Sequence, residues 1–120
     1  MALAAIRSEN GSLVVSAVIN SKPCDMVIDS GDAIGPTFTT ADATRLGLPV
    51  GTAEGIEGAG GASSVYQTTA SVAVGDAVFQ DEPCAVDPQL QGYSLIGLPF
   101  FQAKGNGLLL DWHDRTLLLF

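Results

Sequence analysis

The chain has 120 residues, of which 47% are hydrophobic and 15% charged, and this composition excludes a disordered segment. Its formal net charge of −8, with only five Lys and Arg, excludes partners that need clustered cations, namely nucleic acid and anionic membrane surfaces. No apolar run approaches the ~20 residues that cross a bilayer, so we expect no membrane partner. The length fits one domain, and we predict that residues 1–120 form it.

Residues 1–7 lack the basic segment and apolar stretch of a signal peptide, so we expect no secretion signal, which is compatible with a cytoplasmic location. Short apolar runs separated by turn residues then predict a mainly β chain. The first strand is expected at residues 13–19 and the second at 24–28. Residues 39–46 are expected to form a short helix, because Thr39 can cap its start and a glycine follows its end.

The second half of the chain begins with a glycine-rich segment, residues 54–64, in which no apolar period runs. We expect a mobile loop or a hairpin tip there. The remaining elements are expected in this order: strands at 65–74 and 77–86 with a break near 80–83, a loop at 87–93, a buried strand at 94–97, a short helix at 99–103, and a final hairpin of 108–111 and 116–120. Together they predict one compact, mainly antiparallel β domain.

The residues present exclude several kinds of catalytic and binding site. The single histidine, His113, falls in the expected turn of the last hairpin, which disfavours triads that need a histidine base. No His, Cys, Asp or Glu cluster has metal-ligand spacing, and residues 58–61 match neither a phosphate loop nor a dinucleotide fingerprint. We therefore expect no metal and no cofactor. Cys24 and Cys84 are expected to be buried thiols, with a single disulfide as the alternative.

One motif remains, where the apolar residues 26–28 lead directly into Asp29-Ser30-Gly31. A carboxylate at the end of a buried strand is costly unless hydrogen bonds or a shared proton compensate it. It can be a structural turn in which Asp29 accepts backbone N–H groups, and the tripeptide alone does not distinguish this from a catalytic site.

The surroundings of this motif resemble the retropepsin-like aspartic proteases, including their single-lobed bacterial members. The resemblance covers the chain from about residue 13 to residue 120. The matching segments follow the family's order: Asp29-Ser30-Gly31 after an apolar strand, Arg45-Leu46-Gly47-Leu48 at the end of a helix, flap glycines within 57–61, Leu95-Ile96-Gly97, and Pro99-Phe100-Phe101 in a short helix. This resemblance implies a mainly β, closed, barrel-like lobe with one or two short helices.

For function, the resemblance implies an aspartic endopeptidase. One lobe of this family supplies one catalytic Asp, so the implied enzyme is a homodimer in which Asp29 of each copy shares one proton and activates a water. Ser30 and Gly31 would complete the catalytic loop of each copy. A peptide or protein substrate would lie as an added strand, bound by Asp32, Ala33, Gly58, Ala59, Gly60, Gly61, Leu95 and Ile96.

The chain also departs from the family's pattern. Asp32 stands where Ala or Ser is usual, and it adds a negative charge beside a site that already holds two acids. The stretch from Asp32 to the helix is one residue longer than usual and contains Gly35-Pro36. These departures leave a weak or inactive peptide-binding or dimerisation module as the alternative function. Leu95 and Ile96 have core packing as their alternative role, and an unrelated small β-barrel with a chance Asp-Ser-Gly is the third interpretation.

Overall fold

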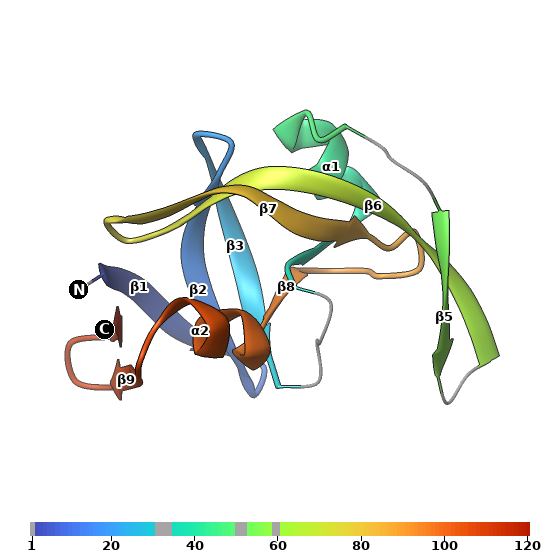
Figure 1. The fold of residues 1–120 in the computed structure, drawn as a ribbon. Coiled ribbons are helices and arrows are strands. Elements are labelled where there is room, and N and C mark those ends of the chain that lie inside the picture. Colours follow the sequence, from blue (N-terminus) through green and yellow to red (C-terminus); the bar gives the residue numbers. More distant parts are fainter. Residues whose placement is uncertain (1, 31–34, 50–52, 59–60) are drawn as a thin grey trace.

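The computed structural model describes residues 2–30, 35–49, 53–58 and 61–120. Short strands and two short helices alternate in these residues (Figure 1). In chain order the elements are β1 (Ala2–Glu9), β2 (Ser12–Ile19), β3 (Lys22–Asp29), β4 (Thr37–Phe38), α1 (Thr40–Leu46), β5 (Ala53–Gly58), β6 (Gly61–Val74), β7 (Ala77–Val86), β8 (Ser94–Gly97), α2 (Leu98–Lys104), β9 (Leu108–Asp111) and β10 (Thr116–Leu119). The predicted mainly β fold with two short helices is confirmed.

The strands form one sheet that closes on itself. Its order is β5-β6-β7-β4-β8-β3-β2-β1-β10-β9, and an additional pairing of β6 with β2 closes the part from β6 to β2 into a barrel. Most neighbouring strands are antiparallel, but β3 with β8 and β4 with β7 are parallel. In Figure 1, β6 and β7 pass across β2 and β3, as this closure requires. The predicted barrel-like lobe is therefore present.

The core fills the barrel because side chains of a strand point alternately to its two faces. Val15, Ala17 and Ile19 of β2, and Cys24 and Met26 of β3, are at most 2% exposed. Burying a large apolar side chain of this kind contributes ~1.5–3 kcal/mol. Other elements complete the core with fully buried side chains, among them Phe38, Ile96 and Leu117.

The strand predicted at residues 13–19 is present as β2, but it is not the first strand, because β1 precedes it. β1 pairs with β2 and with β10, and it buries Ala4 and Ile6. Asn10 and Gly11 connect β1 to β2 with φ angles of 51° and 80°. A two-residue turn with two positive φ angles is the hairpin connection that Asn-Gly favours. The sequence thus contained the Asn-Gly signal of a hairpin turn. The strand before it was not predicted because the alanines of β1 have low strand propensity.

Helix α1 begins and ends where the sequence predicts. Thr39 Oγ1 accepts a hydrogen bond from the backbone N of Asp42 at 3.0 Å, which caps the first turn. Gly47 ends the helix with a φ of 67°, a left-handed conformation that other residues avoid.

The predicted helix at 99–103 is α2. No helix in the described part of the chain has the length and apolarity to cross a membrane.

The predicted break near residues 80–83 is a local irregularity inside the continuous strand β7. The register of β6 and β7 shifts between Ala70 and Val72, where two residues of β7 face one residue of β6. Asp81 has a φ of 53° at this point, as expected at a β-bulge. Strand β4 has only two residues and was not predicted at all, because a segment this short carries no periodicity.

Candidate active site

Asp29 is the last residue of β3, at the end of a barrel strand. In register it lies opposite Gly97, the last residue of the parallel strand β8. The Asp29 side chain is half-buried, whereas Ser30 is exposed. Gly31, Asp32 and Ala33 lie outside the described residues. The structure therefore places the acid of the motif where a buried strand reaches the surface.

Strand β3, which carries Asp29, pairs with a neighbouring strand on each side and packs against the core. Met26 is fully buried, and Ile28 packs against the core. β3 is paired with β2 on one side and with β8 on the other. A carboxylate on a strand fixed by two neighbours has a defined position, which catalysis requires.

Leu95 and Ile96, both on β8, have different environments. Ile96 is fully buried in the core, which is the alternative role considered for it. Leu95 is half-buried and lies opposite Val27 of β3 and Thr37 of β4 in register. Of the two, Leu95 has side-chain surface that a ligand can contact, and Ile96 supports the strand next to Asp29.

A polar network, buried at Ser94 and exposed at Arg45, joins β8 to α1. Ser94 Oγ donates a hydrogen bond to Asp42 Oδ2 at 2.5 Å and accepts one from the backbone N of Thr39 at 3.1 Å. Arg45 pairs with the other oxygen of Asp42 at 3.2 Å and donates to the carbonyl of Pro23 on β3 at 2.8 Å. α1 is thereby tied to β8 and β3, the strands that end at Gly97 and Asp29. This network was not predicted from the sequence, because its local signal is a single serine inside an apolar strand.

The glycine-rich segment forms a hairpin, the second of the two predicted possibilities. β5 and β6 pair as far as Gly58 opposite Gly61, so two of the three predicted flap glycines adjoin the tip. Ala59 and the third glycine, Gly60, lie outside the described residues. Figure 1 shows this hairpin standing away from the barrel and pointing toward the same edge of the view as the Asp29 end of β3. The arrangement suits a segment that closes over a ligand.

The sequence model of the aspartyl protease family matches residues 15–100, a range that includes Asp29 and the Ser94 network. The chain belongs to the aspartyl protease family. Its enzyme class is that of the aspartic-type endopeptidases, which are hydrolases, and the resemblance stated from the sequence is confirmed. No curated protein matches the chain.

Solved structures share the fold of this aspartyl protease. The crystal structure of a retropepsin-like aspartic protease from Rickettsia conorii is 21% identical, with a TM-score of 0.74, and the match covers 98% of this chain and 96% of that one. The EIAV protease complexed with the inhibitor HBY-793 is 22% identical, with a TM-score of 0.65, and the match covers 87% of this chain and 98% of that one. These likenesses establish the retropepsin-like fold.

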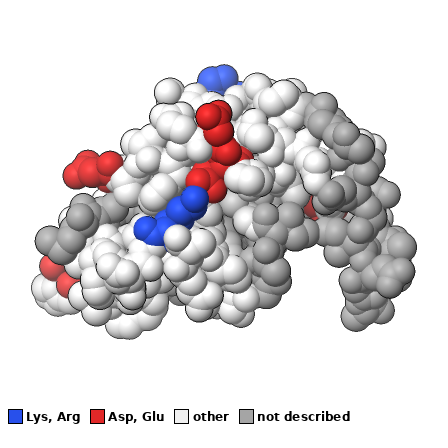
Figure 2. All heavy atoms as spheres, viewed as in Figure 1, with Lys and Arg blue, Asp and Glu red and all other residues white. Residues whose placement is uncertain are grey.

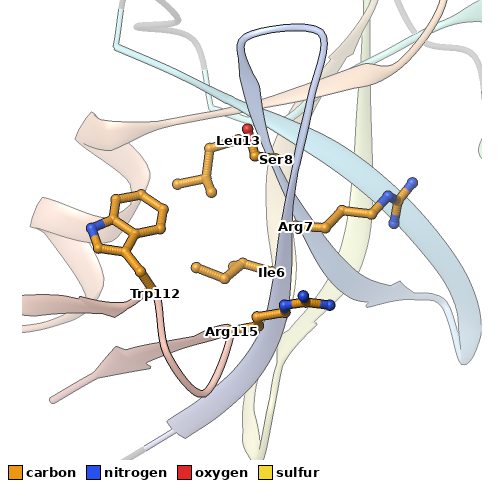
Figure 3. Close-up of a pocket in the computed structure, with 6 residues that line it drawn as sticks. All are labelled: Ile6, Arg7, Ser8, Leu13, Trp112 and Arg115. Atoms are coloured by element: carbon orange, nitrogen blue, oxygen red, sulfur yellow. The ribbon is translucent and has the colours of Figure 1, made fainter.

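The aspartyl protease also has a cleft of about 320 Å³ beside β1 and β2, lined by both apolar and polar side chains. Figure 3 shows Ile6 and Leu13 reaching toward the ring of Trp112, while the Arg7 guanidinium points away from them. That guanidinium donates to the hydroxyl of Tyr93 at 2.9 Å and also forms ion pairs at the surface. The cleft is completed by Ser8 and Arg115. Arg7 therefore contributes its stem to the cleft, not its charge.

Cys24 lies beside the Ser94 network, with its Sγ 3.9 Å from Asp42 Oδ2. Burial raises the pKa of the Cys24 thiol to about 12, and the Asp42 carboxylate adds to this shift. Cys24 and Cys84 are both buried thiols, as predicted. Because the thiolate is the nucleophilic form, a thiol held protonated in this way is unsuited to cysteine catalysis.

His113 lies in the turn between β9 and β10, exposed, with its Nδ1 3.0 Å from Asp114 Oδ1. Among the described residues, no group of three or more His, Cys, Asp and Glu could hold a metal ion. On the face drawn in Figure 2 most of the surface is uncharged, and the few cations lie near acids.

Proposed function

We propose that residues 1–120 form one domain of a homodimeric endopeptidase, in which Asp29 and the partner's Asp29 together hydrolyse peptide bonds. The observation that carries this proposal is the position of Asp29, half-buried at the end of a strand fixed between β2 and β8, in a chain of the aspartyl protease family. The sequence holds one Asp-Ser-Gly motif. A two-fold axis next to it supplies the second acid from an identical copy.

The two carboxyl groups share one proton, because two carboxylates in contact cannot both stay ionised; the aspartic-protease dyad is itself the standard example of this effect. The ionised carboxylate takes a proton from a water as the water oxygen bonds to the peptide carbonyl carbon. The protonated carboxyl gives its proton to the carbonyl oxygen. The carbon–nitrogen bond then breaks as the dyad gives its proton to the leaving amine. A hydroxyl of the tetrahedral intermediate returns its proton to the dyad as the product carboxyl forms, so one shared proton remains.

The other predicted site residues support this chemistry. Ser30, exposed beside Asp29, hydrogen-bonds across the dimer, and Gly31 allows the tight turn that follows. The substrate lies as an extended strand between Asp29 and the β5–β6 hairpin, with Gly58 to Gly61 closing over it and Leu95, Asp32 and Ala33 beside it. Ile96, a residue of β8, supports that strand by packing into the core.

The test compares two acid-to-amide variants on a diverse peptide library. Asp29→Asn removes the carboxylate and is expected to abolish cleavage, a loss of at least about a thousandfold. Asp76→Asn is the matched control, since Asp76 is exposed in the β6–β7 turn, and it is expected to cleave like the wild type.

Cleavage that survives in Asp29→Asn would contradict the assignment of Asp29. If the wild type leaves every peptide intact but binds some of them, the proposed hydrolysis is wrong. The chain is then a peptide-binding module on the protease fold, consistent with the unusual Asp32.

A further inference from the structure

One arginine of the cleft beside β1 and β2 differs from the other cations of the chain. Of the five Lys and Arg, Arg7, Arg45 and Lys104 form ion pairs with carboxylates, and Lys22 donates to the backbone carbonyl of Arg45. Arg115 is the fifth, and in the part of the chain that the structure describes its exposed side chain has no hydrogen bond or ion pair. Its guanidinium is therefore available to the carboxylate of a ligand.

The apolar side chains of the cleft lie next to this arginine. Ile6 is buried, Leu13 is half-buried, and Trp112, at 67%, is the most exposed large apolar side chain among the described residues. In Figure 3 the ring of Trp112 faces Ile6 and Leu13, and Arg115 lies beside Ile6. An exposed indole beside a cleft can bury much apolar surface when a ligand covers it. A ligand here can cover Trp112 with an apolar group and place a negative charge on Arg115.

Hydrogen bonds fix the turn that carries both side chains. Asp111 Oδ1 accepts hydrogen bonds from the backbone N of His113 at 3.0 Å and of Asp114 at 3.1 Å. The backbone carbonyl of Arg115 accepts one from the backbone N of Ile6 at 3.0 Å, which ties the turn to β1. A site formed in advance loses less conformational freedom when it binds a ligand. The two sides of the cleft are therefore in place without a ligand.

The volume and chemistry of the cleft restrict the ligand. A volume of about 320 Å³ is at the lower end of the ~300–1,000 Å³ of small-molecule sites, which suits a single residue better than a long segment. An arginine binds a carboxylate through paired N–H donors. The C-terminal residue of a peptide carries its side chain and its carboxylate together, so it can contact Trp112 and Arg115 at once. An internal Asp or Glu needs a neighbouring residue for the apolar contact.

We propose that this cleft binds the C-terminal residue of a peptide that ends in an apolar side chain, with its carboxylate on Arg115 and its side chain against Trp112 and Leu13. Endopeptidases produce such peptides, because hydrolysis leaves a new carboxylate at the end of one product. None of the described residues that line the cleft belongs to β3 or β8, the strands that end at Asp29 and Gly97. The cleft is thus a second peptide site, and binding to it needs no cleavage.

The test titrates the protein at pH 7 with acetyl-Ala-Ala-Leu, whose C-terminus is a free carboxylate. Trp112 is the sole tryptophan, so its fluorescence reports directly on the cleft. Two further peptides serve as comparisons: acetyl-Ala-Ala-Leu-amide lacks the charge, and acetyl-Glu-Ala-Leu-amide carries it on a side chain. Arg115→Gln removes the guanidinium, and Lys22→Gln is the matched control, because it removes one positive charge from a residue that does not line the cleft.

The free-acid peptide is expected to change the Trp112 emission of the wild type saturably, and both amidated peptides are expected to bind at least about tenfold more weakly. Arg115→Gln is expected to bind the free-acid peptide at least about tenfold more weakly than the wild type, and Lys22→Gln is expected to bind it equally well. No saturation at up to about 10 mM peptide, or equal binding by Arg115→Gln, would overturn the proposal. Equal binding of the glutamate peptide would show that the site does not select a C-terminus and would overturn it too.

Binding at the cleft and cleavage at Asp29 can be tested separately. Asp29→Asn is expected to bind the free-acid peptide like the wild type, because Asp29 does not line the cleft. A wild-type protein that binds this peptide through Arg115 but cleaves no peptide of the library would support the cleft site and contradict the proposed function. Cleavage without binding would leave the proposed function in place and overturn the cleft site.

Discussion

Among single residues, Cys24 illustrates how burial controls a reactive group. Its pKa is raised from 9.0 to about 12, first by burial and then by the Asp42 carboxylate. We predict that at pH 9 iodoacetamide alkylates Cys24 at least about a hundredfold more slowly in the folded protein than in the urea-unfolded chain, because the thiolate is the reactive form. Mass spectrometry of the peptide that contains Cys24 measures both rates. Equal rates would contradict the effect of burial on the pKa of Cys24.

The same shift has a consequence for stability. In the unfolded chain the Cys24 thiol loses its proton at a lower pH than in the folded protein. The stabilisation of the folded state by Cys24 is therefore fully present below pH 9.0 and is lost as the pH rises toward about 12.

The order of residue types along the chain was enough to identify Asp29 as a candidate site residue. It did not identify the polar network that ties the neighbouring strand β8 to α1. The run of apolar residues that ends in an acid is visible in six consecutive positions. The contact between Ser94 and Asp42 joins residues 52 positions apart, which only the folded chain brings together. No spacing rule connects two such residues, because their distance depends on how β8 and α1 pack.

At the scale of elements, Gly75 holds the β6–β7 turn against β1. Its φ is +59°, and a Cβ there would overlap the backbone of Leu3. Gly92 is a suitable comparison, because its φ is +82° but nothing lies within 4 Å of a Cβ. We predict that Gly75→Ala lowers the free energy of unfolding by about 2 kcal/mol more than Gly92→Ala, since only the first adds a steric overlap to the backbone strain. Urea unfolding at fixed protein concentration measures both, and equal losses would contradict the close packing of this turn.

The elements that local signals define were predicted well. α1 has a capping threonine at one end and a glycine at the other, and both act as the sequence indicates. β1 and β4 were missed for different physical reasons. β1 has alternating burial but weak strand formers, and β4 exists only because β7 and β8 lie on either side of it.

For the whole molecule, the order of motifs along the chain predicted the fold class, whereas the closure of the barrel did not follow from any one segment. The pairing of Val18 with Ala73 and of Ile19 with Val72 closes it across more than 50 residues. The position of β9 at the edge of the sheet is likewise a property of the complete topology. Asp29 and the retropepsin-like lobe could therefore be predicted from the sequence, and the closure of the barrel could not.

The most direct test of the central claim mixes wild-type protein with equal amounts of Asp29→Asn and allows the subunits to exchange. If each active site needs Asp29 from both copies, only dimers of two wild-type chains cleave peptide, and activity per total protein falls to about one quarter of the pure wild type. If each chain works alone, activity falls only to about one half, and the account of a shared pair of acids is contradicted.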